Sequence, residues 1–278
     1  MTIKTLLACM LDQSGGATLA AAGTALADRF GAHLTGLHTL EAVIVYPGIG
    51  MYVPGPTFEL FNEAQKAEGA AIRKVFDEAV RRAAVTGEWR EVHSGAADAS
   101  ERMIESARAA DLVLMARPDS VVDRPNQRHA FGRVVREGGR PVLLVPPGGL
   151  GDGIGKRVVL AHAATRESAR AAFDMLPLLR PGCDVHVVHV GDERDELRDA
   201  AMTELSSALS RHGHGVTMTH RARHGDGVAD VLMREAPEVG ADLIAAGAFG
   251  HSRTYDFFVG ATTGALMRES EVPVLFST

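Results

Sequence analysis

Short apolar runs alternate with amphipathic segments along the whole chain. The first run, Ile3–Met10, has the length of a buried strand. After it, small and apolar residues recur at the spacing of one helix face, at Leu19, Ala22, Gly23, Leu26 and Phe30. Strands that are apolar throughout are typical of parallel sheets covered by helices on both faces. The pattern therefore predicts an α/β protein in which parallel strands and helices alternate.

The same alternation predicts five strands in each half of the chain. In the first half we expect strands at Ile3–Met10, Leu34–Leu40, Trp89–His93, Leu112–Met115 and Val142–Val145. In the second half we expect strands at Val158–His162, Val185–Val190, Val216–Arg223, Leu243–Ala246 and Val274–Phe276. Helices are expected between the strands, among them Ala99–Ala109, Phe131–Arg136, Glu193–His212 and Val228–Ala236.

A segment rich in proline and glycine, Pro146–Gly155, separates the two halves and has no apolar period. It predicts a first domain at 1–147, a linker at 148–155 and a second domain at 156–278.

The two halves also repeat one another. Asp111 begins the sequence Asp-Leu-Val-Leu-Met, and Asp242 begins Asp-Leu-Ile-Ala-Ala. The first half is longer chiefly through the segment 41–57, which is apolar but contains three prolines and three glycines. We expect this segment to be an ordered loop that folds over the first domain or against a neighbouring chain.

Composition and charge narrow the class of protein. The 278 residues are 46% hydrophobic and 23% charged, which excludes a disordered chain. The net charge of −6 argues against sequence-independent binding of nucleic acid, which needs a basic face. No apolar run approaches membrane-spanning length, and the first residues do not have the pattern of a signal peptide. Cys9 and Cys183 fall in predicted buried strands, which suits a reducing cytoplasm better than a disulfide.

The most informative stretch follows the predicted strand Leu243–Ala246. Two residues separate Gly247 from Gly250, and nine separate Gly250 from Gly260, where a segment with helical spacing begins. In a parallel sheet, the loop at the carboxyl end of a strand is where ligands bind. Glycines let backbone N–H groups approach a phosphate closely, and the following helix N-terminus adds partial positive charge.

This glycine spacing resembles the nucleotide-binding signature of the universal stress protein family, and the resemblance extends over essentially the whole chain. It implies two flavodoxin-like (adenine-nucleotide-hydrolase-like) domains, each with a parallel five-stranded sheet. It implies binding of ATP or a related adenine nucleotide by the second domain, with the backbone of Val190 at the adenine. The residues that the resemblance places around the phosphates are Gly247, Gly250, His251, Ser252, Gly260, Ala261 and Thr262.

The two halves depart from the family pattern in opposite ways. The family carboxylate after the first strand corresponds to Asp12 in the first half, whereas Ala163 stands there in the second. The first half lacks the paired glycines, and Arg117 and Pro118 stand where the backbone would meet phosphate. We therefore expect nucleotide binding in the second half alone. The missing carboxylate at Ala163 argues against a magnesium site there, while backbone donors would still recognise phosphate.

The resemblance implies a cytoplasmic protein of stress response or signalling rather than a catalyst. No nucleophile–base pair, paired carboxylates or CxxC set stands out, so at most slow ATP hydrolysis is expected. A second hypothesis is an interaction module of the same family that dimerises without nucleotide. A remote one is an adenylating ATP pyrophosphatase, because Ser14-Gly15-Gly16 follows the first strand, although a helix-capping turn explains this run better. The clustered histidines of the second half are interpreted as surface or core residues rather than metal ligands.

The expected partners follow from the apolar strands and from the same resemblance. Val142–Val145 and Val274–Phe276 are short apolar strands that would be hazardous if unpaired, so we expect them to pair inside one chain. The two domains would then form an intramolecular pseudo-dimer, and the family also forms dimers of whole chains. We expect no nucleic-acid partner and no membrane partner.

Overall fold

The structure, a computed structural model, describes residues 2–40, 55–93, 99–118, 125–192, 196–250 and 260–278. The chain forms two compact units. The first, here called the N-terminal unit, consists of Ile3–Ala116 and Arg124–Gly138. The second, the C-terminal unit, consists mainly of Gly139–Thr278 and takes in Arg117 and Pro118 as well.

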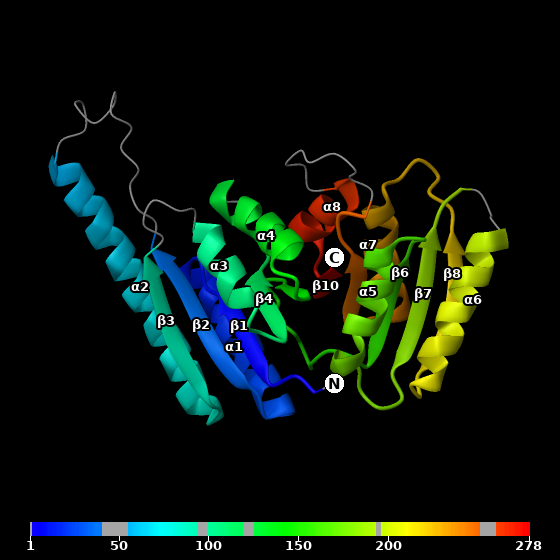
Figure 1. The fold of residues 1–278 in the computed structure, drawn as a ribbon, viewed down its shortest axis with the longest axis horizontal. Helices are drawn as coiled ribbons and strands as arrows, with labels where there is room; N and C mark the ends of the chain where they lie inside the picture. Colours follow the sequence, from blue (N-terminus) through cyan, green and yellow to red (C-terminus); the bar gives the residue numbers. More distant parts are fainter. Residues whose placement is uncertain (1, 41–54, 94–98, 119–124, 193–195, 251–259) are drawn as a thin grey trace. The chain divides into compact units, whose positions relative to one another are not determined.

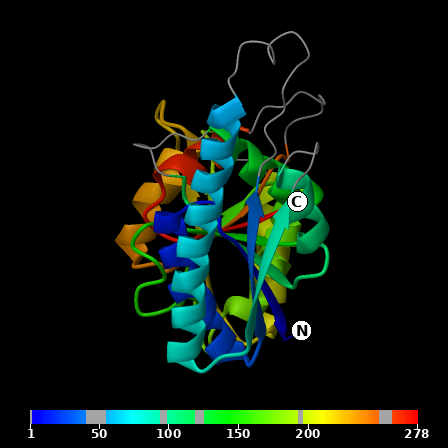
Figure 2. The ribbon, with the colours of Figure 1, turned by 90° about the vertical axis from the view of Figure 1, so that its left-hand side faces the viewer.

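The N-terminal unit is a parallel sheet with helices on both faces. Its strands lie in the order β3-β2-β1-β4, and all the pairs among them are parallel. Helix α1 packs with α2, and α3 packs with α4. Figure 2 shows α2 on one side of β2 and β3 and α3 on the other. The elements are β1 (Thr5–Cys9), α1 (Gln13–Phe30), β2 (His33–Leu40), α2 (Gly55–Ala83), β3 (Gly87–His93), α3 (Ala99–Ala107), β4 (Leu112–Ala116) and α4 (Pro125–Glu137).

The C-terminal unit has the strand order β5-β10-β9-β6-β7-β8, in which only the β5–β10 pair is antiparallel. Figure 1 draws its strands and helices from green through yellow to red. They are β5 (Val142–Val145), β6 (Arg157–His162), α5 (Arg166–Asp174), the 3₁₀ helix η1 (Leu176–Leu178), β7 (Asp184–Val190), α6 (Glu196–Arg211), β8 (Gly215–Arg221), α7 (Val228–Val239), β9 (Leu243–Gly247), α8 (Ala261–Glu269) and β10 (Val274–Ser277).

The predicted α/β class is confirmed, because strands and helices alternate along the chain and the strand pairs described above are parallel except for β5–β10. The central strands are also buried. Residues 243–246 of β9 and all of β5 and β10 are buried, as expected for strands with helices on either side. The thiols of Cys9 and Cys183 are buried and free, and burial raises the pKa of each to about 12.

The predicted pairing of the two short apolar strands is confirmed. Leu143 of β5 lies opposite Leu275 of β10, and Val142 lies opposite Phe276. Strand β5 therefore packs with the C-terminal unit, although the sequence analysis placed it in the domain 1–147. The boundaries 1–147, 148–155 and 156–278 remain predictions, as does a pseudo-dimer of the two domains.

Two helices begin earlier than predicted. Helix α2 starts at Gly55, inside the expected loop 41–57, and α4 starts at Pro125 rather than near Phe131. Both starts contain a proline, whose missing N–H costs nothing in the first helical turn. The predicted helix Glu193–His212 is seen from Glu196. The expectation that the loop covers a cleft concerns residues 41–54, which lie outside the described part of the chain.

Candidate ligand-binding site

A cavity of about 1340 Å³ lies in the C-terminal unit, at the carboxyl ends of β6, β7 and β9. Its walls come from the loop after β6, the loop after β7, the first turns of α7 and the glycine loop after β9. Helices α5 and α8 begin at its edge. The N-terminus of α5 is capped by Thr165, whereas that of α8 has no side-chain cap. This edge of a parallel sheet is the usual position for a ligand, and helix N-termini favour an anion.

Most of the site residues predicted from the sequence lie around this one cavity. Its lining includes Val190 from the end of β7, Gly247 and Gly250 from the loop after β9, and Gly260, Ala261 and Thr262 at the start of α8. His251 and Ser252 lie outside the described residues. The structure thus brings six of the eight predicted residues together, and their contact with a nucleotide remains a prediction.

The three glycines of the loop differ in how closely other atoms surround them. A Cβ atom on Gly247 would come within 2.5 Å of the backbone C of Glu167 and the backbone N of Ser168. A Cβ on Gly250 would lie 2.9 Å from the Glu167 carboxylate and 3.1 Å from the Thr165 hydroxyl. A Cβ on Gly260 would meet no atom of the described chain within 4 Å, although Gly260 lines the cavity. Packing therefore accounts for Gly247 and Gly250, while Gly260 borders open space.

The loop between β6 and α5 is held by its own hydrogen bonds. Thr165 caps α5, its hydroxyl accepting from the backbone N of Ser168 at 3.2 Å. The Ser168 hydroxyl donates to the Ala161 carbonyl (3.1 Å) and accepts from the backbone N of Ala163 (3.0 Å). Ala163 is half-buried and forms part of the cavity wall in this fixed loop.

In the N-terminal unit, the carboxylate of Asp12 performs the capping role that Thr165 has in α5. Its Oδ1 accepts from the backbone N of Gly15 at 2.8 Å. Its Oδ2 accepts from the side-chain amide of Gln127 at 2.8 Å. Both oxygens of Asp12 are therefore bonded within the unit, and its position in the local structure corresponds to Thr165 rather than to Ala163.

Glu167, the second residue of α5, was not singled out from the sequence. Its side chain is buried, and Oε1 accepts from the Nε of Arg166 at 2.5 Å. Burial by itself would raise the pKa of Glu167, but hydrogen bonds from Arg166, the backbone and Thr165 outweigh it and lower the pKa. An ionised carboxylate at the N-terminus of α5 suits the helix dipole, and it borders the glycine loop at Gly250.

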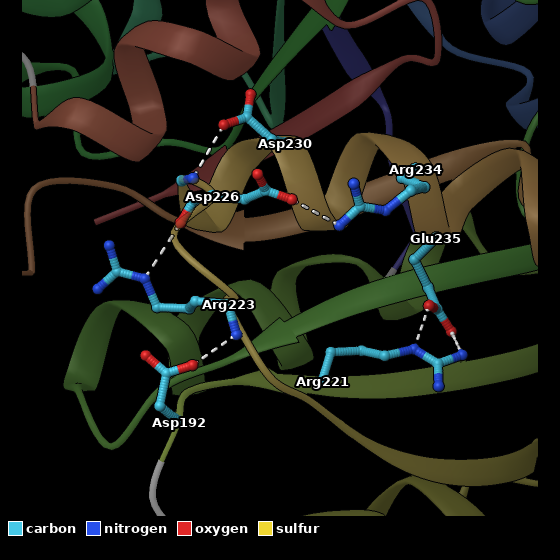
Figure 3. Close-up of polar contacts among 8 residues, drawn as sticks. Asp192, Arg221, Arg223, Asp226, Asp230, Arg234 and Glu235 are labelled. Atoms are coloured by element: carbon cyan, nitrogen blue, oxygen red, sulfur yellow. Dashed lines mark hydrogen bonds and ion pairs between the residues drawn. The ribbon is translucent and has the colours of Figure 1, made fainter.

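The wall formed by β7, β8 and α7 carries a network of polar contacts (Figure 3). Asp192 accepts from the backbone N of Arg223 at 2.7 Å, which joins the loops after β7 and β8. The guanidinium of Arg223 donates from Nε to the Asp226 carbonyl at 3.2 Å. Arg221 makes two hydrogen bonds, of 2.6 and 2.9 Å, to the carboxylate of Glu235, which is only 3% exposed. These bonds fix the β8–α7 corner that carries Arg223 into the cavity lining.

Three histidines stand in register at the ends of three neighbouring strands. His162 of β6 pairs with His189 of β7, and His189 pairs with His220 of β8. The ring centroids are 6.0 Å apart for the first pair and 5.2 Å for the second. His162 and His189 line the cavity together with Arg198 of α6. Burial lowers the pKa of both rings, and their mutual proximity and the Arg198 charge lower that of His162 further.

The charged and imidazole side chains of the cavity were missed because they depend on register and loop geometry. The one sequence signal was the position of His162 and His189 at or next to the end of a predicted strand. Among the described residues, no group of three or more His, Cys, Asp or Glu side chains is arranged to hold a metal ion. None of the helices in the described ranges is long and apolar enough to span a membrane.

Comparison with known proteins shows a family match for the second half of the chain and similar folds for the whole of it. Residues 155–277 match the model of the universal stress protein family. A universal stress protein from Archaeoglobus fulgidus DSM 4304 superposes with a TM-score of 0.70 at 13% identity, covering 98% of this chain and 96% of that one.

Two further structures share the fold over nearly the whole chain. A putative universal stress protein from Pseudomonas aeruginosa UCBPP-PA14 has a TM-score of 0.60 at 15% identity, with 99% and 93% coverage of this chain and that one. The cytoplasmic domain of a prokaryotic cation chloride cotransporter has a TM-score of 0.50 at 10% identity, with 99% and 95% coverage. A comparison with curated protein sequences found no match. Residues 155–277 thus match the universal stress protein family in sequence, and the fold of the chain as a whole is the one that universal stress proteins have.

Proposed function

We propose that the C-terminal unit binds ATP or a related adenine nucleotide in the cavity at the ends of β6, β7 and β9. The observation that carries this proposal is Gly260, the N-cap of α8. Its φ of −53° is open to any residue, and no atom of the described residues crowds its Cβ position. A glycine that neither backbone conformation nor packing requires, at a helix N-terminus facing a cavity, is consistent with close approach of a phosphate.

The cavity supplies complementary chemistry for the two ends of a nucleotide. The first N–H groups of α8, at Ala261 and Thr262, have no acceptor in the preceding turn of their own helix and are free to bind phosphate oxygens. Arg198 and Arg223 add positive charge to the lining. Apolar side chains from β7 and α7, namely Val188, Val190, Val228 and Leu232, form a surface suited to a base.

Phosphate recognition in this site would rest on backbone donors and arginines rather than on a bound cation. Asp192 is bonded to the backbone of Arg223, and Glu167 is bonded to Arg166. Thr165 caps α5 with a hydroxyl, at the position where Asp12 caps α1 with a carboxylate. We therefore propose that nucleotide affinity depends only weakly on magnesium.

The role that fits this site is nucleotide-dependent signalling or protection under stress, rather than catalysis. The cavity offers donors and apolar walls, which suit binding. A bound nucleotide would stabilise the C-terminal unit in one state, which other proteins would recognise. An interaction module that works without nucleotide is the competing function, and the experiment below separates the two.

The decisive experiment is calorimetric titration of ATP into the wild type and the Gly260→Val variant. We expect the valine to lower affinity by at least about tenfold, because its side chain would occupy the space in front of the α8 N-terminus. The matched control is Gly148→Val, since Gly148 also has nothing within 4 Å of its Cβ position but lies outside the cavity lining. The control should bind ATP like the wild type.

Two results would contradict the proposal. One is unchanged ATP affinity in a folded Gly260→Val protein. The other is a wild type that binds no adenine nucleotide and carries none after purification, as judged by absorbance at 260 nm and analysis after acid release. The second result would leave the interaction module as the better reading.

A further inference from the structure

The row of His162, His189 and His220, of which the first two line the cavity, is not uniform in its bonding. His189 accepts at Nε2 from the guanidinium of Arg198 at 3.2 Å, because arginine can only donate. Its Nδ1 therefore carries the proton and donates to the His162 carbonyl at 3.1 Å. His220 donates from Nε2 to the Gly191 carbonyl at 2.8 Å. Both rings thus serve to hold neighbouring strand ends in place.

The ring of His162 differs from both of the others. It is 8% exposed, it lines the cavity, and its Nδ1 is buried without a hydrogen-bond partner among the described residues. The Nδ1 of His220 also lacks a partner among the described residues, but His220 does not line the cavity and its Nε2 is already bonded. A buried polar atom without a partner costs free energy, so such atoms are rare unless a ligand or water completes them. His162 is therefore the member of the row that the protein leaves available to a bound molecule.

The strand order would place His162 beside the ribose, the middle part of a bound nucleotide. Strand β6 lies between β9, which leads into the glycine loop, and β7, which carries Val188 and Val190. A nucleotide whose phosphates lie at the α8 N-terminus and whose base lies on the β7 side has its ribose over the end of β6. If the molecule were reversed, with its phosphates toward Arg198 and Arg223, the ribose would still lie over β6.

We propose that His162 hydrogen-bonds a ribose hydroxyl of the bound nucleotide and thereby selects ribonucleotides over deoxyribonucleotides. This inference rests on the proposed function, because it concerns the same cavity and the same ligand. A neutral imidazole has one donor and one acceptor, and a ribose hydroxyl can supply the complement of either. Burial, His189 and Arg198 all lower the pKa of His162, which keeps the ring in the neutral form that this contact needs.

The test compares ATP, 2′-deoxy-ATP and 3′-deoxy-ATP by calorimetry on the wild type and on His162→Phe. A hydrogen bond that is lost on removal of one hydroxyl should reduce affinity about 3- to 10-fold, so the wild type should prefer ATP over at least one analogue by that factor. His162→Phe keeps a ring of similar size but cannot form the bond, so it should bind all three nucleotides equally. His162→Gln, which keeps a donor and an acceptor, should retain part of the preference and serves as the second variant if the phenylalanine does not fold.

The matched control is His186→Phe, because His186 lies on the same strand as His189 but on the opposite face of the sheet. It should keep the wild-type preference. The inference is overturned if the wild type binds ATP and both analogues equally, or if folded His162→Phe retains the wild-type preference. Absence of binding of all three nucleotides by the wild type would overturn the proposed function as well, so the two failures are distinguishable.

Discussion

The space around each glycine of the loop shows whether packing alone explains why the position is a glycine. All three glycines of the loop fit one spacing rule, and from that rule each would be expected to approach phosphate. The structure shows instead that Gly247 is pressed against the start of α5, whereas Gly260 faces open space. Sequence spacing identified the loop, but it could not reveal which neighbour each glycine has, because those neighbours come from a different helix.

The first prediction concerns stability at these two positions. Gly247→Ala should destabilise the C-terminal unit by about 2 kcal/mol or more, because its Cβ overlaps the backbone of Glu167 and Ser168, which cannot rotate away. Gly260→Ala should change the unfolding free energy by less than about 0.5 kcal/mol, as a change at an uncrowded site does. Urea denaturation of both variants measures the difference. Equal stabilities would show that the close approach at Gly247 is relieved by a small shift of α5.

The second prediction concerns pH. The pKa of His162 and of His189 is lowered in the folded protein, mainly by burial, so the unfolded chain binds more protons as the pH falls. The stability that the neutral rings contribute is therefore complete above the unfolded pKa of about 6.5 and is lost as the pH falls through the folded values. We expect the unfolding free energy to decrease between pH 7.5 and pH 5.5.

His162→Phe removes one of these groups, so its unfolding free energy should decrease less over the same range. The measurement is urea denaturation at several pH values, kept above the range in which Glu167 and other carboxylates titrate. An identical pH dependence in wild type and variant would contradict a lowered pKa at His162.

At the scale of helices and strands, most boundaries were predictable because one physical cause dominates each. The buried strands are apolar without alternation, and α1 ends at Gly31, whose φ of 55° suits glycine. Asp230 in the first turn of α7 accepts from the backbone N of Gly227 at 2.9 Å, which suits a carboxylate at a helix N-terminus. The histidine row was not predictable, because it exists only through the register of three parallel strands.

The third prediction concerns the cap of α1. Asp12→Ala should lower the unfolding free energy of the N-terminal unit by about 1 kcal/mol, the usual cost of losing an N-cap side chain. It should leave ATP affinity unchanged within a factor of about two, because both carboxylate oxygens are bonded to Gly15 and Gln127 within that unit. Denaturation and calorimetry on the same variant test both parts. A large loss of affinity would mean that Asp12 serves a nucleotide directly.

At the scale of the whole chain, the two halves repeat one order of elements but have diverged in their loops. The sequence analysis located this divergence in the glycine loop, the acidic position and the residues Arg117 and Pro118. The structure adds that Arg117 is committed to other contacts, donating to the Ser270 carbonyl at 3.1 Å and to the Glu271 carboxylate at 2.8 Å. Arg117, which the sequence analysis placed where the backbone would meet phosphate, thus bonds to residues of the C-terminal unit instead. Sequence spacing could not show this, because the partners of Arg117 lie 153 and 154 residues away.

The last prediction follows from this asymmetry and concerns stoichiometry. Calorimetry with ATP should give one site per chain, because only the C-terminal unit combines the glycine loop with a cavity among the described residues. Hydrogen exchange should agree: saturating ATP should slow exchange in the β6–α5 loop and the first turn of α8. The corresponding loop after β1, where Asp12 is already bonded to Gly15 and Gln127, should exchange at an unchanged rate. Gly260→Val provides the control, since it should abolish the protection as well as the heat of binding. Two sites per chain, or protection around Asp12, would show that the N-terminal unit binds nucleotide without a glycine loop.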